Sequence, residues 1–546
     1  MLTKVYTAAI QGIDAFPITI ETSVERGTVF SIVGMADTAV KESQLRIESA
    51  MKCCGLQFPH ARVTINLAPA DVKKEGANFD LPLAIGLLTA SEVLKCEDLA
   101  SFMVTGELSL DGSLLPVKGV LPMAVKAREM GFKKLIVPAA NVTEAAVVNK
   151  LEVYGASNLT EAVQIMQGNA GIEPTCINTR ELFARQCDQF DFDFSEVKGQ
   201  ENVKRAFEVA CSGGHNILMV GPPGAGKSMM AKRLPSIMPP LGMAEALETT
   251  KIHSVAGKLS RGSMLMTTRP FRTPHHTVSP VALVGGGANP MPGEISLAHN
   301  GVLFLDEFPE FPRQVLEVLR QPIEDRVITV SRAKYTVNYP ASFMLVASMN
   351  PCPCGYYGHP TKRCTCQPGQ VAKYMNKISG PLLDRIDLQI EIEPVPFDAM
   401  ADKTEAERSA DIRARVVAAR RIQQERYKDL PGVYCNAQMN SRLLREYAWP
   451  DAEGMAKLKD RMTRLNMSAR AFDRILRVAR TIADLESAVA MMGARGAERG
   501  ARDGEQPALG PVMTLEEAVN APVQTRHIAE AIGYRSLDRG SYGTNF

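Results

Sequence analysis

A glycine-rich run in the middle of the chain carries the residue types that bind phosphate. It follows the apolar stretch NILMV, precedes the helix-like stretch SMMAKRL, and consists of Gly221, Pro222, Pro223, Gly224, Ala225, Gly226, Lys227 and Ser228. The glycines let consecutive backbone N–H groups face a phosphate, and the N-terminus of the following helix attracts anions. The lysine of such a run reaches the β- and γ-phosphates, and its serine hydroxyl binds Mg²⁺. The run therefore predicts a P-loop that takes ATP with Mg²⁺.

Two carboxylates about eighty residues further on complete the expected metal site. The apolar stretch VLFL ends in Asp306 and Glu307. Apolar strands often end in carboxylates by chance, but a P-loop upstream favours a functional interpretation. We expect Asp306 to hold Mg²⁺ through water and Glu307 to orient and deprotonate the attacking water.

Three further polar residues are candidates for ATP hydrolysis. Asn350 ends the stretch ASFMLVASMN, and with it the segment resembles the AAA+ ATPases, where this position, sensor 1, holds the water near the γ-phosphate. By the same resemblance, Arg385 in SGPLLDRIDL is the arginine finger that acts on the ATP of the neighbouring subunit, and Arg470 in SARAFDRILRVAR is the sensor 2 arginine. The alternative for each arginine is a surface salt bridge. A finger acting on a neighbour implies a homo-oligomer, and the family resemblance implies a hexamer.

Four of the 11 cysteines lie close together. They form two C-x-C pairs, Cys352 with Cys354 and Cys364 with Cys366. Four thiolates suit Zn²⁺, which would hold together a loop too polar to form its own core. His359 between the pairs is an alternative ligand. We expect a structural zinc site that fixes Asn350 and the Arg385 segment relative to each other.

The apolar patterning divides the 546 residues into four parts. Strand-like and helix-like stretches alternate over residues 1–170, and residues 171–190 form a linker. Residues 191–395 resemble a nucleotide-binding domain with a parallel sheet, and residues 396–546 are mostly helical. A stretch near residues 493–511, rich in Gly, Ala and charge, predicts a disordered loop.

Overall charge indicates no class of partner, because 62 Lys and Arg face 60 Asp and Glu, a net charge of +2. The N-terminus does not resemble a secretory signal, and no long apolar run predicts a membrane span. These features favour the cytoplasm, where clustered cysteines more often bind metal than form disulfides.

Several long motifs resemble the Mg-chelatase-like AAA+ family of ComM and YifB. They are GPPGAGKS, RPFRTPHHT, GEISLAHNGVLFLDE, NPCPCGYYG and SGPLLDRIDL, and the resemblance spans essentially the whole chain. It implies a multidomain α/β protein with a Lon-protease-like, ribosomal S5-type N-terminal domain, an AAA+ P-loop core and a C-terminal helical lid. The activity implied is that of a hexameric DNA helicase that promotes branch migration during integration of transforming DNA.

The Lon-like resemblance raises the question of peptidase activity. The position of the nucleophilic serine is taken by Asn78, and the position of the activating lysine by Leu121. An amide has no nucleophilic hydroxyl, so we expect a domain used for assembly or for gripping DNA. Lys118 lies near position 121 in the sequence, so a peptidase dyad with a rearranged lysine stays open as an alternative.

Contacts with single-stranded or branched DNA are expected in the pore of the ring. The stretches RVITVSR and KYTVNY predict a hairpin whose tip carries Arg332 and Lys334, our first choice, and the loop Gly285–Gly287 is the second choice. The alternative is that the hairpin tip is an ordinary exposed turn that does not contact DNA. The adjacent His275 and His276 are expected to point to different sides of an extended segment, so we do not assign them as metal ligands.

Two other classes of function remain open. One is a chelatase-type motor that remodels a protein partner, and the other is a AAA+ protease, which the residues at positions 78 and 121 disfavour.

Overall fold

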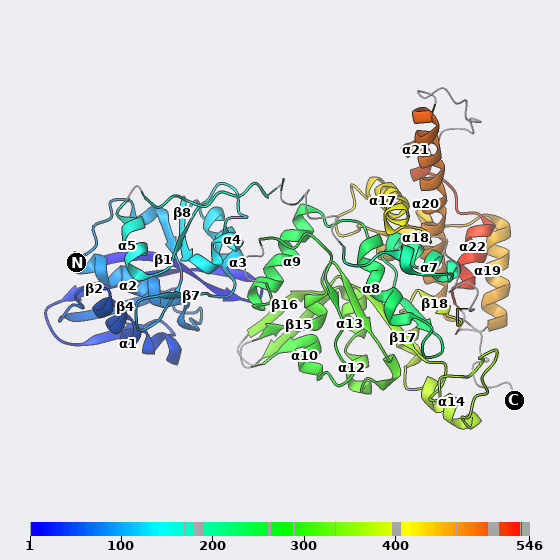
Figure 1. Ribbon diagram of the computed structural model, residues 1–546, viewed down its shortest axis with the longest axis horizontal. Helices are drawn as coiled ribbons and strands as arrows, with labels where there is room; N and C mark the ends of the chain where they lie inside the picture. Colours follow the sequence, from blue (N-terminus) through cyan, green and yellow to red (C-terminus); the bar gives the residue numbers. More distant parts are fainter. Residues whose placement is uncertain are drawn as a thin grey trace.

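The chain forms three regions that follow one another along the longest axis of the molecule (Figure 1). The computed structural model describes residues 2–168, 171–179, 181, 183, 190–259, 264–287, 290–332, 335–395, 406–465, 467–500, 513–535 and 537. An N-terminal α/β region is followed by a central region on a parallel sheet and by a helical C-terminal region. The expected order of an α/β part and a helical part is therefore confirmed.

The N-terminal region has a seven-stranded mixed sheet with helices on both faces. Its strand order is β3 (Phe30–Val33), β4 (Arg62–Ala68), β2 (Asp14–Glu25), β1 (Leu2–Gln11), β5 (Phe102–Val104), β8 (Lys134–Pro138) and β9 (Glu152–Ala156). Successive residues of a strand point to opposite faces, so β8 sends Leu135 and Val137 into one core and Ile136 into the other. The first core includes α3 (Val120–Glu129) and α4 (Val142–Ala145). The second includes α1 (Thr38–Cys53), α2 (Asp80–Ala90) and α5 (Leu159–Met166).

The central sheet is parallel throughout, as the alternating pattern predicts. Its strand order is β11 (Phe271–Arg272), β14 (Val302–Leu305), β17 (Met344–Met349), β10 (Ile217–Val220) and β18 (Leu388–Glu391). β10, β14 and β17 are buried along their whole length, which is why they are continuous apolar runs rather than alternating ones. All five strands end at the same edge of the sheet, so the polar residues that follow them lie along that edge.

A β-hairpin lies between the central sheet and the N-terminal region. β15 (Val327–Arg332) pairs with β16 (Tyr335–Pro340) in antiparallel register, so the predicted hairpin is confirmed. Gly12, in the turn between β1 and β2, packs against it, since a Cβ there would lie 2.7 Å from Cγ1 of Val337. Arg332 is the last residue of β15, and Lys334 at the expected tip lies outside the described residues.

The C-terminal region is helical and shares one hydrophobic core with the central region. It contains α17 (Ser409–Arg426), α18 (Ser441–Tyr447), α19 (Ala452–Leu465), α20 (Ala469–Gly500), α21 (Leu515–Val519) and α22 (Thr525–Gly533). Side chains of α17 and α20 pack in one cluster with α7 (Glu201–Gly213) and α8 (Lys227–Ile237) of the central region. Among the helices of the described ranges, none has the length and apolar character needed to cross a bilayer.

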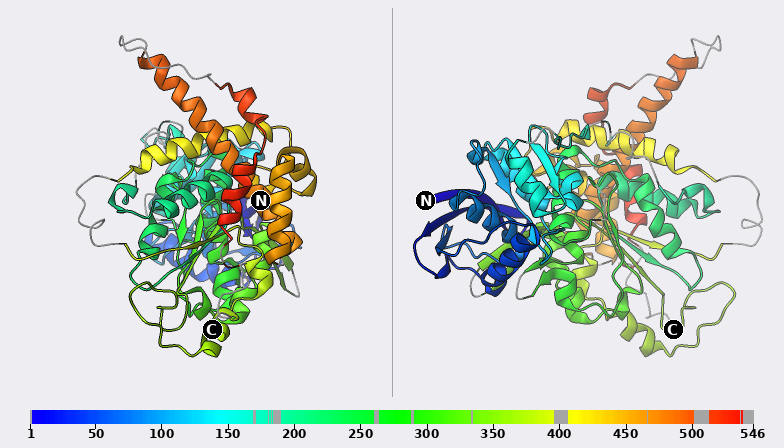
Figure 2. Two further views of the ribbon diagram at one scale, coloured as in Figure 1. Left: turned by 90° about the vertical axis from the view of Figure 1, so that its right-hand side faces the viewer. Right: turned by 60° about the vertical axis from the view of Figure 1, so that its left-hand side comes forward.

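The start of the predicted loop near residues 493–511 is helical instead. α20 continues to Gly500 and projects from the rest of the molecule (Figure 2). The reason is local, because the Ala, Arg and Glu residues in GARGAERG favour a helix even without an apolar face. Residues 501–512 lie outside the part of the chain that is described.

A fully buried ion pair holds the helical region together. Asp484 on α20 accepts hydrogen bonds from Nη1 and Nη2 of Arg426 on α17, at 2.8 and 2.7 Å, and from Nε of Arg480 at 3.0 Å. Burial alone would raise the pKa of Asp484, but the two arginines outweigh it and hold the pKa below its ordinary value. The pair is therefore charged at neutral pH, and its contribution to stability is lost only as the pH falls through the folded-state pKa.

Replacing Asp484 should leave buried arginines without a counter-ion. We expect Asp484→Ala to lower the free energy of unfolding by about 3–5 kcal/mol, the usual cost of breaking a buried pair. The matched control is Asp460→Ala, which removes an exposed partner of Arg464 and should cost under about 1 kcal/mol. Urea unfolding followed by circular dichroism checks both. Equal midpoints for the two variants would contradict this interpretation.

Candidate active site

The glycine-rich run forms a loop from the carboxyl end of β10 to the first turn of α8. Gly226 has φ 86°, a left-handed conformation that L side chains rarely adopt, and α8 begins at the next residue. Gly221 lies against the end of β18, since a Cβ there would lie 2.5 Å from the carbonyl oxygen of Ile392. The loop therefore presents backbone N–H groups at the N-terminus of an 11-residue helix, the arrangement that binds phosphates.

Lys227 is held in this loop beside Asn350. Its Nζ donates to the carbonyl oxygens of Gly221 at 2.6 Å and Pro222 at 2.9 Å, and to Oδ1 of Asn350 at 3.1 Å. Burial lowers the pKa of Lys227, while the negative charges of Asp306 and Glu307 act in the opposite direction. The structure thus brings together the predicted phosphate-binding lysine and the predicted sensor asparagine.

Asp306 lies at the centre of the site and contacts two hydroxyl groups. Its carboxylate accepts hydrogen bonds from Oγ of Ser228 at 2.6 Å and from Oγ of Ser348. Sequence reasoning missed Ser348, and its only signal is a polar residue within the apolar strand β17, two positions before Asn350. The parallel pairing of β14 and β17 brings the strand ends that carry Asp306 and Asn350 next to each other.

The donor set fits Mg²⁺. Hydroxyl and carboxylate oxygens are the ligands that Mg²⁺ prefers, and it retains several waters in such sites. Ser228 and Asp306 would hold the ion beside the loop that faces the phosphates. When bound, Mg²⁺ neutralises charge on the β- and γ-phosphate oxygens. These residues also fit ATP, whose phosphates would meet the N–H groups of the loop and the ammonium of Lys227.

Glu307 follows directly and has an unusual backbone conformation. Its φ is 53°, its N–H donates to Oδ1 of Asp306 at 3.1 Å, and its side chain is 58% exposed. Oε2 of Glu307 lies 3.4 Å from Nδ1 of His276. Sequence reasoning gave His276 no role. The expectation that His275 and His276 point to different sides is wrong, because their ring centroids lie only 4.0 Å apart.

The two predicted arginines lie away from this site in their own subunit. Arg385 is buried and contacts Glu324 on α13 (Arg320–Asp325), with Nε 2.9 Å from Oε1, and its carbonyl oxygen lies 3.4 Å from Nδ2 of Asn216. Asn216 directly precedes β10, so Arg385 lies at the amino end of the sheet, opposite the P-loop.

Arg470 is exposed on the first turn of α20. One turn later, Arg474 donates to Asp387, just before β18 and also at the amino end of the sheet. The structure therefore joins neither Arg385 nor Arg470 to Lys227. The role of Arg385 as a finger for the neighbouring subunit and that of Arg470 as the sensor 2 arginine stay predictions.

The four clustered cysteines come together in a loop that follows Asn350. The sulfur atoms of Cys352 and Cys354 are 3.3 Å apart, those of Cys354 and Cys364 are 3.5 Å apart, and all four sulfurs, with that of Cys366, lie within 4.8 Å of one another. Among the described residues this is the one group of His, Cys, Asp or Glu side chains close enough to share a metal ion. Four thiolates at this spacing fit Zn²⁺.

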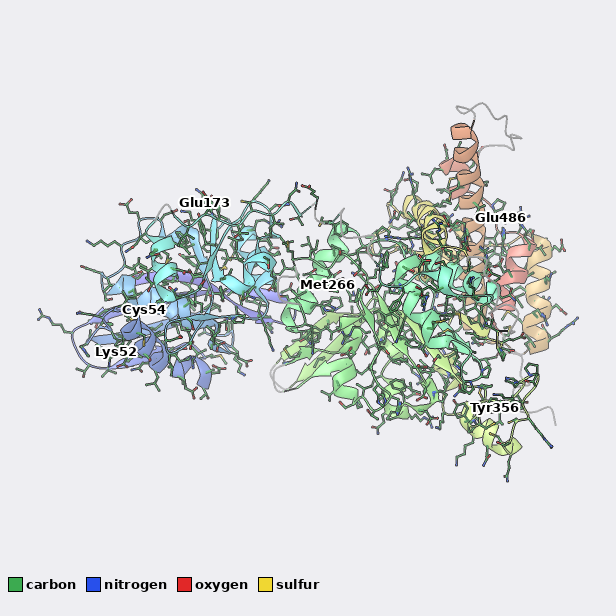
Figure 3. The ribbon with its side chains drawn as sticks, in the orientation of Figure 1. Lys52, Cys54, Glu173, Met266, Tyr356 and Glu486 are labelled. Carbon is green, nitrogen blue, oxygen red and sulfur yellow. The ribbon has the colours of Figure 1, made fainter. Side chains whose placement is uncertain are left out.

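The cysteine loop packs on the P-loop, while His359 faces its own turn. A Cβ on Gly355 would lie 2.6 Å from Cδ of Pro223. Nδ1 of His359 accepts hydrogen bonds from the N–H groups of Thr361 and Lys362, at 3.1 and 3.0 Å, so it is a loop-forming side chain here. Figure 3 places Tyr356 of this loop at the end of the molecule away from the N-terminal region.

The residues at the peptidase positions of the N-terminal region are engaged in structural contacts. The carbonyl oxygen of Asn78 accepts the N–H of Gly106 at 3.0 Å, and Leu121 is fully buried. Lys118 packs against Gly257, which follows α9 (Met243–Val255). A Cβ on Gly257 would lie 2.7 Å from Cε of Lys118. Lys118 thus packs between the N-terminal and central regions.

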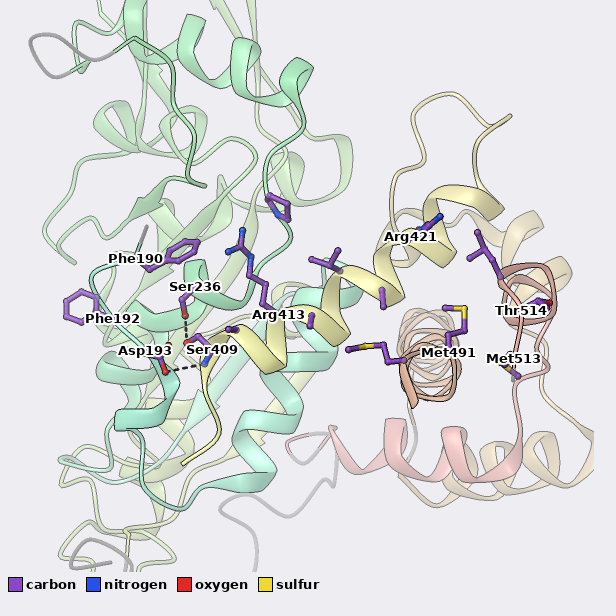
Figure 4. A pocket seen from close by; sticks show the side chains of 17 residues that line it. Phe190, Phe192, Asp193, Ser236, Ser409, Arg413, Arg421, Met491, Met513 and Thr514 are labelled. Carbon is purple, nitrogen blue, oxygen red and sulfur yellow. Dashed lines mark hydrogen bonds between the residues drawn. The ribbon is translucent and has the colours of Figure 1, made fainter. Parts of the chain in front are cut away.

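A large cavity lies elsewhere, along α17. It has a volume of about 1030 Å³. Ser236, Ser409 and Arg413 are among the side chains around it (Figure 4). None of the P-loop, Asp306, Glu307 or Asn350 lines this cavity, so it is separate from the phosphate site.

Comparison with known proteins finds matching family models along most of the chain. A family model described as magnesium chelatase, subunit ChlI, matches residues 193–400, and models of the same subunit match residues 20–141 and, for its C-terminal part, 406–495. The chain is 40% identical over 541 residues to the uncharacterized protein YifB of Salmonella typhimurium, and 39% identical over 541 residues to the competence protein ComM of Haemophilus influenzae. Each match covers 98% of both chains.

A weaker similarity covers one part of the chain. An archaeal Lon protease of Thermoplasma acidophilum is 27% identical over 149 residues, which is 26% of this chain and 22% of that protein. The similarity to Lon is therefore partial, whereas the similarity to YifB and ComM extends from end to end. The chain belongs to the Mg-chelatase-like AAA+ family of ComM and YifB.

Proposed function

We propose that this protein is an ATP-driven, ring-forming DNA motor, a hexameric helicase that promotes branch migration during integration of transforming DNA. The observation that carries the proposal is the convergence of Lys227, Ser228, Asp306, Glu307 and Asn350 at one edge of the parallel sheet. These residues supply phosphate binding, metal binding and a base for water. The end-to-end similarity to a protein named for competence supports the choice of DNA as substrate.

Hydrolysis in this proposal requires a neighbouring subunit. Lys227 and Asn350 hold the phosphates and the water, and Glu307 takes the proton of the water. Charge that develops in the transition state requires a further cation, and Arg385 of the adjacent subunit would supply it. Arg470, exposed on α20, is proposed as the sensor 2 arginine that would reach the γ-phosphate from the helical lid.

The proposed DNA contacts lie on the hairpin and on the insert before β14. Arg332 and Lys334 would contact phosphates, which a motor recognises without reading sequence. Gly285–Gly287 would contribute backbone groups. The N-terminal region, a Lon-like and S5-type fold in this proposal, contacts the hairpin at Gly12. We propose that it acts in assembly or in gripping DNA.

One second candidate has a specific observation in its favour. The matching family models describe a magnesium chelatase subunit, which favours a motor that remodels a protein partner. A protease is disfavoured, because Asn78 and Leu121 provide neither nucleophile nor base.

Stimulation of ATP hydrolysis by DNA separates these candidates. We expect single-stranded or forked DNA to raise the ATPase rate of the assembled protein by about tenfold, a modest allosteric coupling. Lys227→Ala should abolish the rate with and without DNA, because it removes the ammonium group proposed to bind the phosphates. A rate indifferent to DNA but raised by a protein partner would support the chelatase-type motor instead.

The role of Arg385 can be tested by mixing inactive subunits. Arg385→Ala and Lys227→Ala should each be inactive alone, since one lacks the finger and the other the phosphate-binding lysine. An equal mixture should regain hydrolysis at roughly a quarter of its sites, where an intact P-loop meets an intact finger in a head-to-tail ring. The quantity measured is the ATPase rate after re-assembly. Full activity of Arg385→Ala alone would contradict the proposal.

We further propose that the cysteine loop binds one structural zinc ion that holds it on the P-loop. Mass spectrometry of freshly purified, reduced protein should find one zinc per chain. A paired change of Cys364 and Cys366 to serine should remove it and lower the melting temperature. Cys53→Ser, at an exposed free cysteine, is the matched control and should leave the zinc content unchanged. Wild-type protein with well under one zinc per chain would contradict this.

A further inference from the structure

His276 reaches Glu307 because of how two strands pair. β11 pairs in parallel with β14, with Phe271 opposite Val302 and Arg272 opposite Leu303. Residues that follow β11 therefore emerge beside residues that follow β14. His276 comes four residues after β11, and Glu307 comes two residues after β14. The sheet thus places the imidazole next to the carboxylate proposed to activate water.

The imidazole of His276 is held in a defined place. Its ring lies against that of His275, with centroids 4.0 Å apart and planes inclined by 35°, and it meets the ring of Phe311 edge-on at 6.4 Å. Phe311 is buried in the core on this face of the sheet. His276 is 33% exposed, so it lies at the rim of the site with one side on a fixed aromatic ring.

The segment that carries His276 is also tied down at its start. Nε and Nη2 of Arg272 donate to the two carboxylate oxygens of Glu294, at 2.7 and 2.8 Å. Glu294 begins α11 (Glu294–Leu297), which leads into β14. This paired contact joins the start of the segment to the chain just before the Asp306 and Glu307 strand, so the two strand ends keep their spacing.

Glu307 needs such a contact more than an ordinary surface carboxylate does. Its left-handed backbone, at φ 53°, is rare for a residue with a side chain and is maintained only when its surroundings define it. Its side chain is 58% exposed, so few packing contacts limit its rotation. The contact with Nδ1 of His276 involves Oε2 and leaves Oε1 to accept a proton from water.

We infer that His276 is a positioning residue for ATP hydrolysis, holding the carboxylate of Glu307 toward the attacking water. The inference rests on the ATPase activity in the proposed function and does not depend on DNA. A metal-binding role for the two histidines is not supported, because among the described residues the cysteine cluster is the one group of three or more His, Cys, Asp or Glu side chains close enough to share a metal ion. His276 also belongs to the segment that continues into Gly285–Gly287, so the same residue links the insert to the catalytic carboxylate.

The test compares three variants of the full-length, assembled protein without DNA. His276→Ala should lower kcat for ATP about tenfold with KM unchanged, because positioning acts in the reaction and not in nucleotide binding. His276→Asn should restore kcat to within about threefold of wild type, since the amide N–H of asparagine reaches about as far as Nδ1 of histidine. The matched control is His60→Ala, at an exposed histidine of the N-terminal region. It should keep kcat within about twofold, since it removes no contact to the carboxylate.

Several results would overturn the inference. They are a wild-type kcat in His276→Ala, an equal loss in His60→Ala, a rise in KM with kcat unchanged, or no recovery in His276→Asn. Equal melting temperatures and equal oligomer size across the variants ensure that folding is not the cause. If wild type hydrolyses ATP but unwinds no DNA, the DNA function fails and the His276 result stands by itself. A wild-type protein that hydrolyses no ATP overturns both.

Discussion

The parallel hydrogen bonding of β10, β14 and β17 is the constraint on which the site depends. Val220 lies opposite Met349, and Leu305 lies opposite Ala347, so the three strands end almost level. Lys227, Asp306 and Asn350 come from segments up to 123 residues apart and meet only because of this register. A slip of two residues would move one of them by about 6–7 Å and separate the hydrogen-bonded groups. Burial of both sheet faces specifies the register, since apolar side chains would otherwise face water.

The helical region and the N-terminal region contact the central region in different ways. The helical region shares the core of α7 and α8 and adds a buried polar chain, in which Nε2 of His215 lies 2.7 Å from Oγ1 of Thr481 on α20. Burial lowers the pKa of His215 to about 4, so it is neutral at physiological pH and serves as a fixed connector. The N-terminal region instead contacts the surface of α9, where Glu144 accepts hydrogen bonds from Leu121 and Ser254. The central sheet and the helical region thus share a core, and the N-terminal region is docked on the central region.

Residues with local motifs were predictable from the sequence, whereas those that depend on neighbouring strands were not. The P-loop, Asp306, Glu307 and Asn350 each follow an apolar strand directly, so the pattern of the strand locates them. Ser348 and His276 act through strands that are adjacent only after folding, and no spacing in the sequence indicates this. The expectation for His275 and His276 assumed an extended segment, but the backbone turns at His276, and the two rings therefore share a side. The predicted disordered loop near residues 493–511 begins as helix because its residues have high helix propensity. A prediction from composition alone does not take this propensity into account.

Unwinding of a forked DNA duplex by the assembled protein tests the central claim most directly. Strand separation followed by fluorescence should require ATP and Mg²⁺, and should be absent with a non-hydrolysable ATP analogue. Assembled rings that hydrolyse ATP yet leave the fork intact with ATP and Mg²⁺ present would contradict the account.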